Sequence, residues 1–447
     1  MGDKQINYAN WPSDYGDPRW FISDRFGMFI HFGLFSAVGK HEWIMTFDQM
    51  SEAEYKDYFD HFNPDLFDPK DWAKKAKQAG MKYVVFTTKH HEGFALWDTK
   101  QSDYKVTNTA FGRDLLREVI EAFRAEGIRI GLYFSIIDWH HPDFPLDGFH
   151  PDRDRSEHRV SNDQRDMEKY NEFMYAQIRE LMSDYGRIDY LWFDFVYDFQ
   201  DWGWSKGKGK DDFHSEKIEQ MVRELQPHIL MNNRLGLNRG VVTPEQYQPQ
   251  KPLYADGQPV LWEACQTFNG SWGYDRDNLD WKSSELLIKT LIDTVSKGGN
   301  LLLNVGPNGR GEFDERTNER LAEIGEWMKL HNRSIYDCRE SDYISPKDCR
   351  YTQNGNKLYV HIFSWPLSHL HLPGLSGKVA YAQFLHDGSK IDFVDPKTQE
   401  QYKSPDTLDK DTIALQVPID ENDIILNLPI QRPDVIVPVV ELFLEEE

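Results

Sequence analysis

Residues 190–195 read Tyr190-Leu191-Trp192-Phe193-Asp194-Phe195, an apolar and aromatic run interrupted by a single carboxylate. Such a run is typical of a strand that is buried on both faces, as strands are in parallel sheets. A carboxylate is costly to bury unless another group pairs with it or the protein uses it. We therefore expect Asp194 to end a buried strand and to act as a nucleophile or a base.

Similar runs recur along the first 340 residues, and segments with helical periodicity separate them. The runs occupy residues 27–33, 82–88, 128–135, 228–234, 260–265 and 300–307. Alternation at the spacing of βα units predicts a parallel α/β fold, a (β/α)8-like barrel of the TIM type whose eighth strand is short or irregular. The carboxyl ends of all strands in such a barrel meet at one face, where the active site is built.

The character of the chain changes after about residue 340. Short strand-like runs at 358–363, 379–382, 412–417 and 435–440 follow one another with turn residues and no helix between them. This pattern predicts a small β-sandwich. We therefore divide the chain into a catalytic barrel domain at 1–340 and a C-terminal β-sandwich domain at 341–447.

The composition limits the classes of partner. Lys and Arg number 51 against 74 Asp and Glu, a net charge of −23. Such a surface repels phosphate backbones and anionic lipid, so we expect neither nucleic acid nor a membrane as a partner. The polar N-terminus lacks the apolar core of a secretory signal, and no apolar run is long enough for a bilayer, which favours a cytoplasmic protein. Aromatic residues make 14% of the chain, which suits the stacking of sugar rings.

Several polar residues at or near the strand ends are candidates for chemistry. Glu42 and Glu263 each adjoin a tryptophan, and an apolar setting raises a carboxyl pKa as a general acid requires. Enzymes that cleave glycosides use two carboxyl groups, which flank the glycosidic bond. His31 can be an ordinary core histidine, whereas His90 and His91 follow a strand and suit sugar hydroxyls. A metal site stays open at this point, although no zinc-ligand spacing is present and the three cysteines have none.

Taken in order, the motifs of the chain resemble those of glycoside hydrolase family 29, the α-L-fucosidases. The resemblance extends over nearly the full length. It rests on Arg25 to Gly33, Glu42-Trp43, Thr88-Lys89-His90-His91-Glu92-Gly93-Phe94, Gly131 to Ser135, Trp192-Phe193-Asp194, Trp262-Glu263, Ser271-Trp272-Gly273-Tyr274 and Gly298 to Pro307. The resemblance implies a barrel with a C-terminal β-sandwich, no metal or other cofactor, and a retaining mechanism through a covalent fucosyl-enzyme.

The resemblance also implies roles for single residues. It places the nucleophile at Asp194, and the fucose-binding residues at His31, Glu42, Trp43, His90, His91, Tyr133 and Trp192. Arg234 matches an arginine that supports the nucleophile or the ring hydroxyls. The position of the acid/base varies within the family. We choose Glu263 first and Glu42 as the fallback. One departure is Phe195, since the residue after the nucleophile is often Gly in the family.

The predicted function is thus hydrolysis of terminal α-L-fucose from oligosaccharides or glycoconjugates, with the fucosyl linkage left open. Rival hypotheses are the same machinery acting on an α-L-galactoside or α-L-glucoside, a non-catalytic fucose-binding protein, and a metal-dependent hydrolase. Barrels of this kind often associate, so a homo-oligomer is an open expectation.

Overall fold

The computed structural model describes residues 7–398 and 420–445, which form two compact units. The first unit takes in the described residues up to Pro249, together with Leu253–Lys282 and Asn300–Ala322. The second takes in Gln250–Pro252, Ser283–Gly299 and the described residues from Glu323 onward. Each unit is considered by itself below.

The first unit is built on a parallel sheet that has seven strands within the described residues. The order across the sheet is β5-β4-β3-β2-β1-β9-β8. The strands are β1 Phe26–Ile30, β2 Tyr83–Lys89, β3 Arg129–Ser135, β4 Tyr190–Asp194, β5 Leu230–Met231, β8 Glu263–Thr267 and β9 Asn300–Val305. Every residue of β1, β2 and β9 is buried, as the apolar runs predict.

Residues 241–245 join the two edges of this sheet, β5 and β8. The Val241 amide donates to Met231 (2.9 Å), and the Glu263 amide donates to Val242 (2.9 Å). Parallel bridges pair Val241 with Asn232, Val242 with Trp262, and Glu245 with Cys265. This irregular segment is the eighth strand that the sequence predicts, and it confirms the (β/α)8-like barrel.

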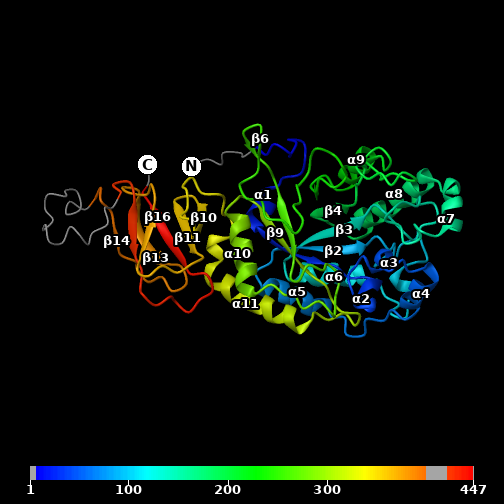
Figure 1. Ribbon diagram of the computed structural model, residues 1–447, viewed down its shortest axis with the longest axis horizontal. Helices are drawn as coiled ribbons and strands as arrows, with labels where there is room; N and C mark the ends of the chain where they lie inside the picture. The colour runs from blue at the N-terminus through cyan, green and yellow to red at the C-terminus, as the bar shows by residue number, and fades with distance from the viewer. Residues whose placement is uncertain (1–6, 399–419, 446–447) are drawn as a thin grey trace. The chain divides into compact units, whose positions relative to one another are not determined.

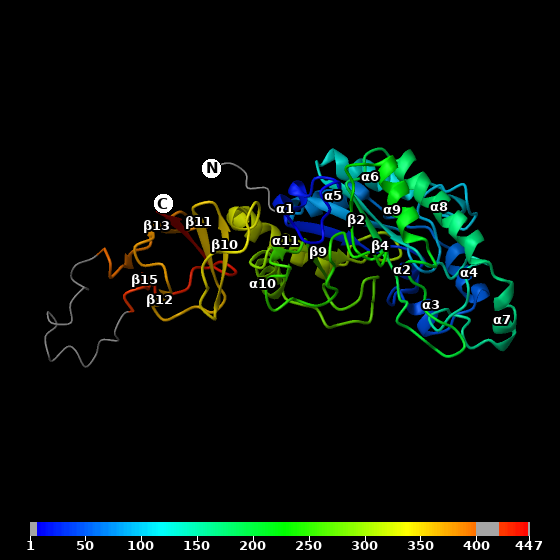
Figure 2. The same cartoon turned by 90° about the horizontal axis from the view of Figure 1, so that it is seen from above.

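Helices flank the strands in the first unit (Figures 1 and 2). Their starts follow local capping: Ser51 and Glu54 form a capping box, and Asp68 and Asp114 cap the next two helices. The helices that lie wholly in this unit are α1 Arg19–Asp24, α2 Leu34–Val38, α3 Ile44–Phe47, α4 Glu52–Asp60, α5 Pro69–Gln78, α6 Leu115–Ala125, α7 Ser156–Val160, α8 Met167–Asp184 and α9 Ser215–Leu225.

Two long segments between the main barrel elements contain short elements of their own. Residues 143–166 include α7 and a 3-10 turn at Asn162–Gln164. The loop is anchored by Asp147, which is buried and accepts from Lys208 Nζ (2.6 Å). The segment 240–259 contains the barrel-closing residues and a hairpin of β6 Tyr254–Ala255 and β7 Gln258–Pro259.

The second unit contains α10 Ser284–Val295, most of α11 Glu315–His331, and two antiparallel sheets. One sheet has the order β10-β11-β16-β13 and the other β12-β15-β14. The strands are β10 Cys349–Asn354, β11 Lys357–Ile362, β12 His369–Leu372, β13 Val379–Phe384, β14 Phe393–Val394, β15 Ile424–Asn427 and β16 Val439–Leu444. Side chains of both sheets share one apolar core, so the predicted β-sandwich is confirmed. The run at 412–417 lies outside the described residues.

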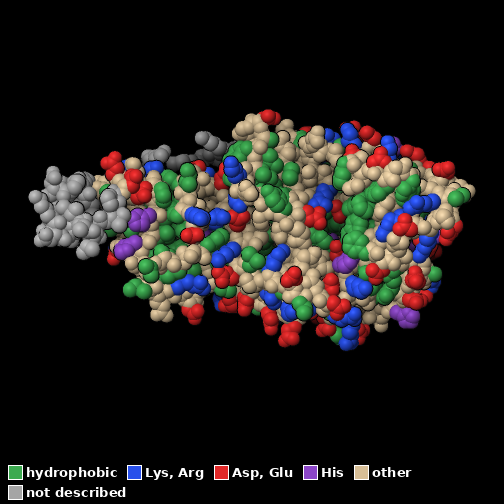
Figure 3. All heavy atoms as spheres, viewed as in Figure 1, with side chains coloured by type: hydrophobic (Ala, Val, Ile, Leu, Met, Phe, Trp, Pro, Cys, Tyr) green, Lys and Arg blue, Asp and Glu red, His purple; other side chains and the backbone are tan. Residues whose placement is uncertain are grey.

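Acidic side chains predominate on the chain, and Figure 3 shows them interspersed with basic ones on the visible face. Among the residues that the structure describes, no helix combines the length and the apolar character needed to cross a bilayer. The cytoplasmic location stays a prediction.

Candidate active site

The carboxyl ends of the barrel strands surround a small pocket of about 70 Å³, which is called the closed pocket below because it is less open to solvent than the groove beside it. Six of the seven residues predicted to bind fucose line it, and so do Asp194 and Arg234. Those six are His31, Trp43, His90, His91, Tyr133 and Trp192, whereas Glu42 does not line the pocket. Four further residues complete the lining, namely Phe29, Phe195, Glu245 and Trp272. The barrel thus brings together residues that are up to about half the chain apart in sequence.

Asp194 is the last residue of β4, and both of its carboxylate oxygens have hydrogen-bond donors. The Tyr133 hydroxyl donates to Oδ2 (2.9 Å), and Arg234 Nη1 donates to Oδ1 (2.9 Å). Burial raises the pKa of Tyr133 well above its usual value, so the phenol stays a donor. The Asp194 side chain is 14% exposed, so a ligand can reach it.

Arg234 links Asp194 to a second carboxylate. Its Nη2 donates to Glu245 Oε2 (2.7 Å), while its Nε donates to the Thr243 hydroxyl (2.9 Å). The guanidinium also lies over the Trp192 ring, 4.5 Å from its centroid. A planar guanidinium fixed in this way holds the two carboxylates near each other at the pocket.

His91 is neutral and has one fixed tautomer. Burial lowers its pKa to about 3. The Ser135 hydroxyl donates to the Ile137 carbonyl (2.7 Å), so at the contact with His91 Nδ1 (2.7 Å) the ring must be the donor. Nε2 therefore carries a lone pair, and it faces Asp194 Oδ2 at 3.8 Å without donating to it.

The same argument fixes His31. Burial lowers its pKa to about 3. The Asn304 amide nitrogen donates to the Trp272 carbonyl (2.7 Å), which leaves its oxygen to accept from His31 Nδ1 (2.7 Å). The Nε2 atoms of His31 and His91 are consequently acceptors suited to ligand hydroxyls.

His90 packs against several neighbouring rings, among them Tyr133 and His91. Its ring stacks on Tyr133, with the planes 10° apart and the centroids at 5.6 Å, and lies 4.1 Å from the His91 ring. Burial lowers the pKa of His90 well below its usual value. Its Nδ1 is buried and has no hydrogen-bond partner among the described residues. A neutral imidazole with an unused nitrogen at a polar pocket is suited to a ligand hydroxyl.

Glu42 lies beside the closed pocket rather than in its lining. Its Oε2 accepts from the backbone amides of Trp272 (3.1 Å) and Gly273 (2.8 Å). Burial raises the pKa of Glu42 to about 7, against the opposing effect of these amides. The carboxyl group belongs to the wall of an adjoining open groove.

Glu263, the first choice for the acid/base from sequence, does not line this pocket. It is the first residue of β8 and is fully buried. The hydroxyls of Tyr83 and Tyr190 donate to it, and these two tyrosines are the first residues of β2 and β4. Glu263 therefore lies at the amino ends of the parallel strands, inside the barrel and opposite the end that carries Asp194. Burial raises its pKa to about 8.

Sequence reasoning missed Glu245 as a site residue because residues 240–259 are rich in Gly, Pro and Gln, a composition typical of a loop rather than a strand. A signal is nevertheless present in Val241-Val242-Thr243-Pro244-Glu245. The β-branched run followed by a carboxylate repeats the pattern that ends at Asp194. The side chain of Glu245 is 40% exposed, so it is the more accessible of the two carboxylates that contact Arg234.

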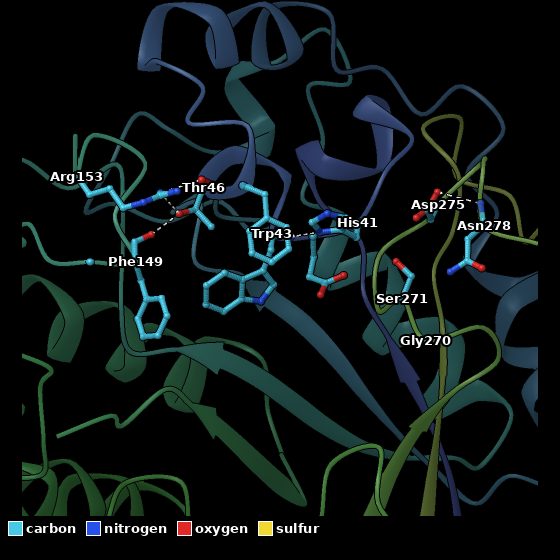
Figure 4. A pocket seen from close by; sticks show the side chains of 12 residues that line it. His41, Trp43, Thr46, Phe149, Arg153, Gly270, Ser271, Asp275 and Asn278 are labelled. Atoms are coloured by element: carbon cyan, nitrogen blue, oxygen red, sulfur yellow. Dashed lines mark hydrogen bonds between the residues drawn. The ribbon is translucent and has the colours of Figure 1, made fainter. Parts of the chain in front are cut away.

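An open groove of about 620 Å³, whose lining residues Figure 4 shows, adjoins the closed pocket. Among the described residues, Trp43 is the one side chain that lines both. The other lining residues are His41, Glu42, Thr46, Phe47, Gly148, Phe149, Arg153, Gly270, Ser271, Asp275 and Asn278. The groove therefore leads away from the pocket that contains Asp194.

Two carboxylates joined by one arginine, neutral histidines and aromatic walls at the carboxyl end of a barrel define the class of glycoside hydrolases. The sequence profile of the Alpha-L-fucosidase family matches residues 4–333. The chain belongs to that family, and it is an enzyme that hydrolyses glycosides, an α-L-fucosidase.

Individual relatives agree with this assignment. The human plasma alpha-L-fucosidase is 30% identical over 387 residues, which cover 78% of this chain and 77% of that protein. The structure of alpha-L-fucosidase isoenzyme 1 from Paenibacillus thiaminolyticus is 42% identical, with a TM-score of 0.86 over 96% of this chain and 99% of that one. A GH29 alpha-L-fucosidase from Bacteroides thetaiotaomicron, solved as a trapped covalent intermediate, is 27% identical with a TM-score of 0.80 over 99% and 100% of the chains.

Proposed function

We propose that this chain is a retaining exo-α-L-fucosidase, which removes terminal α-L-fucose from oligosaccharides or glycoconjugates by double displacement. The observation that carries the proposal is the contact of Arg234 with both Asp194 and Glu245 at the closed pocket. Retaining glycosidases need two carboxyl groups about 5–5.5 Å apart, and one guanidinium that contacts both supports such a short separation. The covalent intermediate of the Bacteroides thetaiotaomicron relative supports the same chemistry.

In the first step Asp194 is the nucleophile. One of its oxygens bonds to the anomeric carbon while the bond from that carbon to the leaving oxygen breaks. The donors Tyr133 and Arg234 hold the carboxylate in place, and a fixed nucleophile avoids the entropic cost of finding its target. The product of this step is a fucosyl ester of Asp194.

For the acid/base we propose Glu245 in place of Glu263. Glu245 gives a proton to the leaving oxygen in the first step and takes one from water in the second. The water oxygen then bonds to the anomeric carbon, and the Asp194 carboxylate is released. Glu245 lines the same pocket as Asp194 and its side chain is 40% exposed, whereas Glu263 is fully buried at the other end of the strands.

The remaining residues bind the sugar. The Nε2 lone pairs of His31 and His91 accept from sugar hydroxyls, as their tautomers require. The Trp43 ring packs against the apolar methyl group of fucose, which distinguishes this sugar from L-galactose. Glu42 binds a sugar hydroxyl, in preference to its fallback role as acid/base, because two backbone amides already fix one of its oxygens.

Proton NMR during hydrolysis of an α-L-fucoside tests the mechanism. Double displacement gives α-L-fucose as the first-formed anomer, whereas β-L-fucose would exclude it. Rates on matched α-L-fucosides, α-L-galactosides and α-L-glucosides test the sugar, and a faster L-galactoside would overturn the choice of fucose. Binding of fucose without turnover of any glycoside would favour a binding protein, and loss of activity with a chelator would favour a metal-dependent enzyme.

A further inference from the structure

The open groove beside the closed pocket has an exposed aromatic ring at its wall. Phe47, the last residue of α3, is 64% exposed, although a phenylalanine is costly to leave in water. Its ring lies 4.7 Å from that of His41 and 6.0 Å from that of Trp43. Since Trp43 also lines the closed pocket, these rings form a continuous aromatic surface from the sugar pocket into the groove.

The second aromatic wall begins directly after Asp194. The Phe195 ring lies 5.2 Å from that of Trp43 and 5.4 Å from that of Phe149. Phe195 has a φ of +92°, a backbone conformation that is costly for any residue except glycine. Strain of this kind persists where the surrounding packing enforces it. The ring is thereby held where the pocket and the groove meet.

Two charged groups of the groove, Arg153 and Asp275, form hydrogen bonds within the protein. Arg153 Nη1 donates to the carbonyl and hydroxyl oxygens of Thr46 (both 2.8 Å), and Asp275 accepts from the backbone amides of Asp277 and Asn278 (3.1 and 3.2 Å). Figure 4 shows Thr46, Phe149 and Arg153 on one side of Trp43, with Ser271, Asp275 and Asn278 on the other. An aromatic surface with separated polar groups fits a neutral sugar ring better than a sulfated or carboxylated one.

We propose that this groove binds the leaving group, which is a neutral pyranose of an oligosaccharide. The apolar face of that pyranose stacks on Phe47. The inference rests on the proposed function and adds the chemistry of the sugar next to fucose. Because the groove adjoins the pocket through Trp43, a sugar bonded to the anomeric carbon at Asp194 extends into it. Binding energy from this sugar then favours oligosaccharides over fucosides with small leaving groups.

The test compares two kinds of substrate that differ in the leaving group, the part that would occupy the groove. In α-L-fucosyl fluoride the leaving group is too small to contact Phe47. The second substrate is the fastest from a panel of disaccharides in which α-L-fucose is linked 1→2 to galactose or 1→3, 1→4 or 1→6 to N-acetylglucosamine. The measured quantity is kcat/KM for the disaccharide divided by kcat/KM for the fluoride.

We expect Phe47→Ala to lower this ratio about tenfold, because the variant loses one stacking contact with the leaving group. The effect should arise mainly from a higher KM for the disaccharide. Phe47→Trp keeps a ring and should restore most of the ratio. The matched control is Phe199→Ala, which removes a ring that is 78% exposed and lines neither the pocket nor the groove. It should leave the ratio at the wild-type value.

Two results would overturn the inference. The first is an unchanged ratio in Phe47→Ala, and the second is an equal fall of the ratio in Phe199→Ala. If the ratio is unchanged because activity falls equally on both substrates, and the oligomeric mass changes as well, Phe47 is a contact between copies of the chain. If the wild type cleaves the fluoride but none of the disaccharides, this inference fails while the proposed function stands. If it cleaves neither, the proposed function itself fails.

Discussion

Asp194 and Glu263 are carboxylates of the same parallel barrel, and both adjoin tryptophan-containing apolar runs, yet they lie at opposite ends of their strands. Asp194 is the last residue of β4 and Glu263 the first of β8. Asp194 contacts a cation and is 14% exposed, whereas Glu263 is fully buried and accepts from two tyrosines. At the carboxyl end of a barrel a polar residue serves chemistry, while at the amino end it serves stability.

The two carboxyl groups therefore differ in their electrostatic surroundings. Arg234 supplies a positive charge beside Asp194. The pKa of Glu263 is raised to about 8 by burial, so near neutral pH this group is mostly an uncharged hydrogen-bonding member of the core. The end of the strand, not the type of residue, decides which carboxylate can meet a substrate.

The largest expected effect concerns the isosteric amides at the two ends. Asp194→Asn should lower kcat by about 10⁴-fold, because an amide cannot form the ester intermediate. Glu263→Gln, its matched control, should keep kcat within about threefold, since the group contacts no ligand. Steady-state kinetics on an aryl α-L-fucoside measure both. A large loss of kcat in a folded Glu263→Gln variant would contradict the claim that only the carboxyl end of the barrel serves catalysis.

The next effect concerns the arginine at the catalytic end. Arg234→Met should lower kcat/KM by about 10²–10³-fold, because it removes a charged donor from both Asp194 and Glu245. Arg310→Met is the control, because Arg310 forms an exposed ion pair with Asp65. An exposed pair contributes little. Similar kinetics for the two variants would show that Arg234 is not needed to hold the carboxylates.

A smaller effect concerns the pH dependence of stability at the amino end. The pKa of Glu263 is raised from 4.5 to about 8, so its contribution to stability is fully present below about 4.5 and is lost as the pH rises through about 8. Glutamine does not titrate. Going from pH 6.5 to pH 8.5, the free energy of unfolding of Glu263→Gln should rise relative to wild type by about 2 kcal/mol. Urea unfolding at both pH values measures this, and a constant difference would contradict the buried position of Glu263.

The smallest effect concerns the strained residue after the nucleophile. Phe195→Gly and Phe195→Ala both remove the ring, but only glycine accepts a φ of +92° without strain. The glycine variant should therefore be more stable than the alanine variant by about 1 kcal/mol. The difference between the two variants in the free energy of unfolding, measured with denaturant, gives the cost of this backbone conformation. A more stable alanine variant would mean that residue 195 does not keep this conformation.

The sequence was sufficient for much of the fold and for most of the pocket. The strand that ends at Asp194 could be predicted because aromatic and apolar residues bury both faces of a parallel strand. His90 and His91 could be predicted to face the site because they follow the strand Tyr83–Lys89. The sugar-binding residues carried over from the family resemblance line the pocket, with the exception of Glu42, although their roles stay predictions.

The choice between Glu263 and Glu245 as acid/base depends on where strand pairing begins, which local sequence patterns do not show. The apolar run at 260–265 indicates a strand, but the ladder starts only at Glu263, which places this carboxylate at the amino end. Glu245 belongs to a segment that pairs through isolated bridges between β5 and β8. Its register is set by closure of the barrel, a long-range constraint that local sequence patterns do not contain.

The most direct test of the two catalytic roles is the anomer of fucosyl azide that each variant forms from an activated α-L-fucoside in the presence of azide. Asp194→Gly should give β-L-fucosyl azide, because azide takes the place of the missing nucleophile in a single inverting step. Glu245→Gly should give α-L-fucosyl azide, because azide attacks the fucosyl ester of Asp194, and Glu263→Gln should form only fucose. Formation of α-L-fucosyl azide by a Glu263 variant, with none from Glu245→Gly, would contradict the account and return the acid/base role to Glu263.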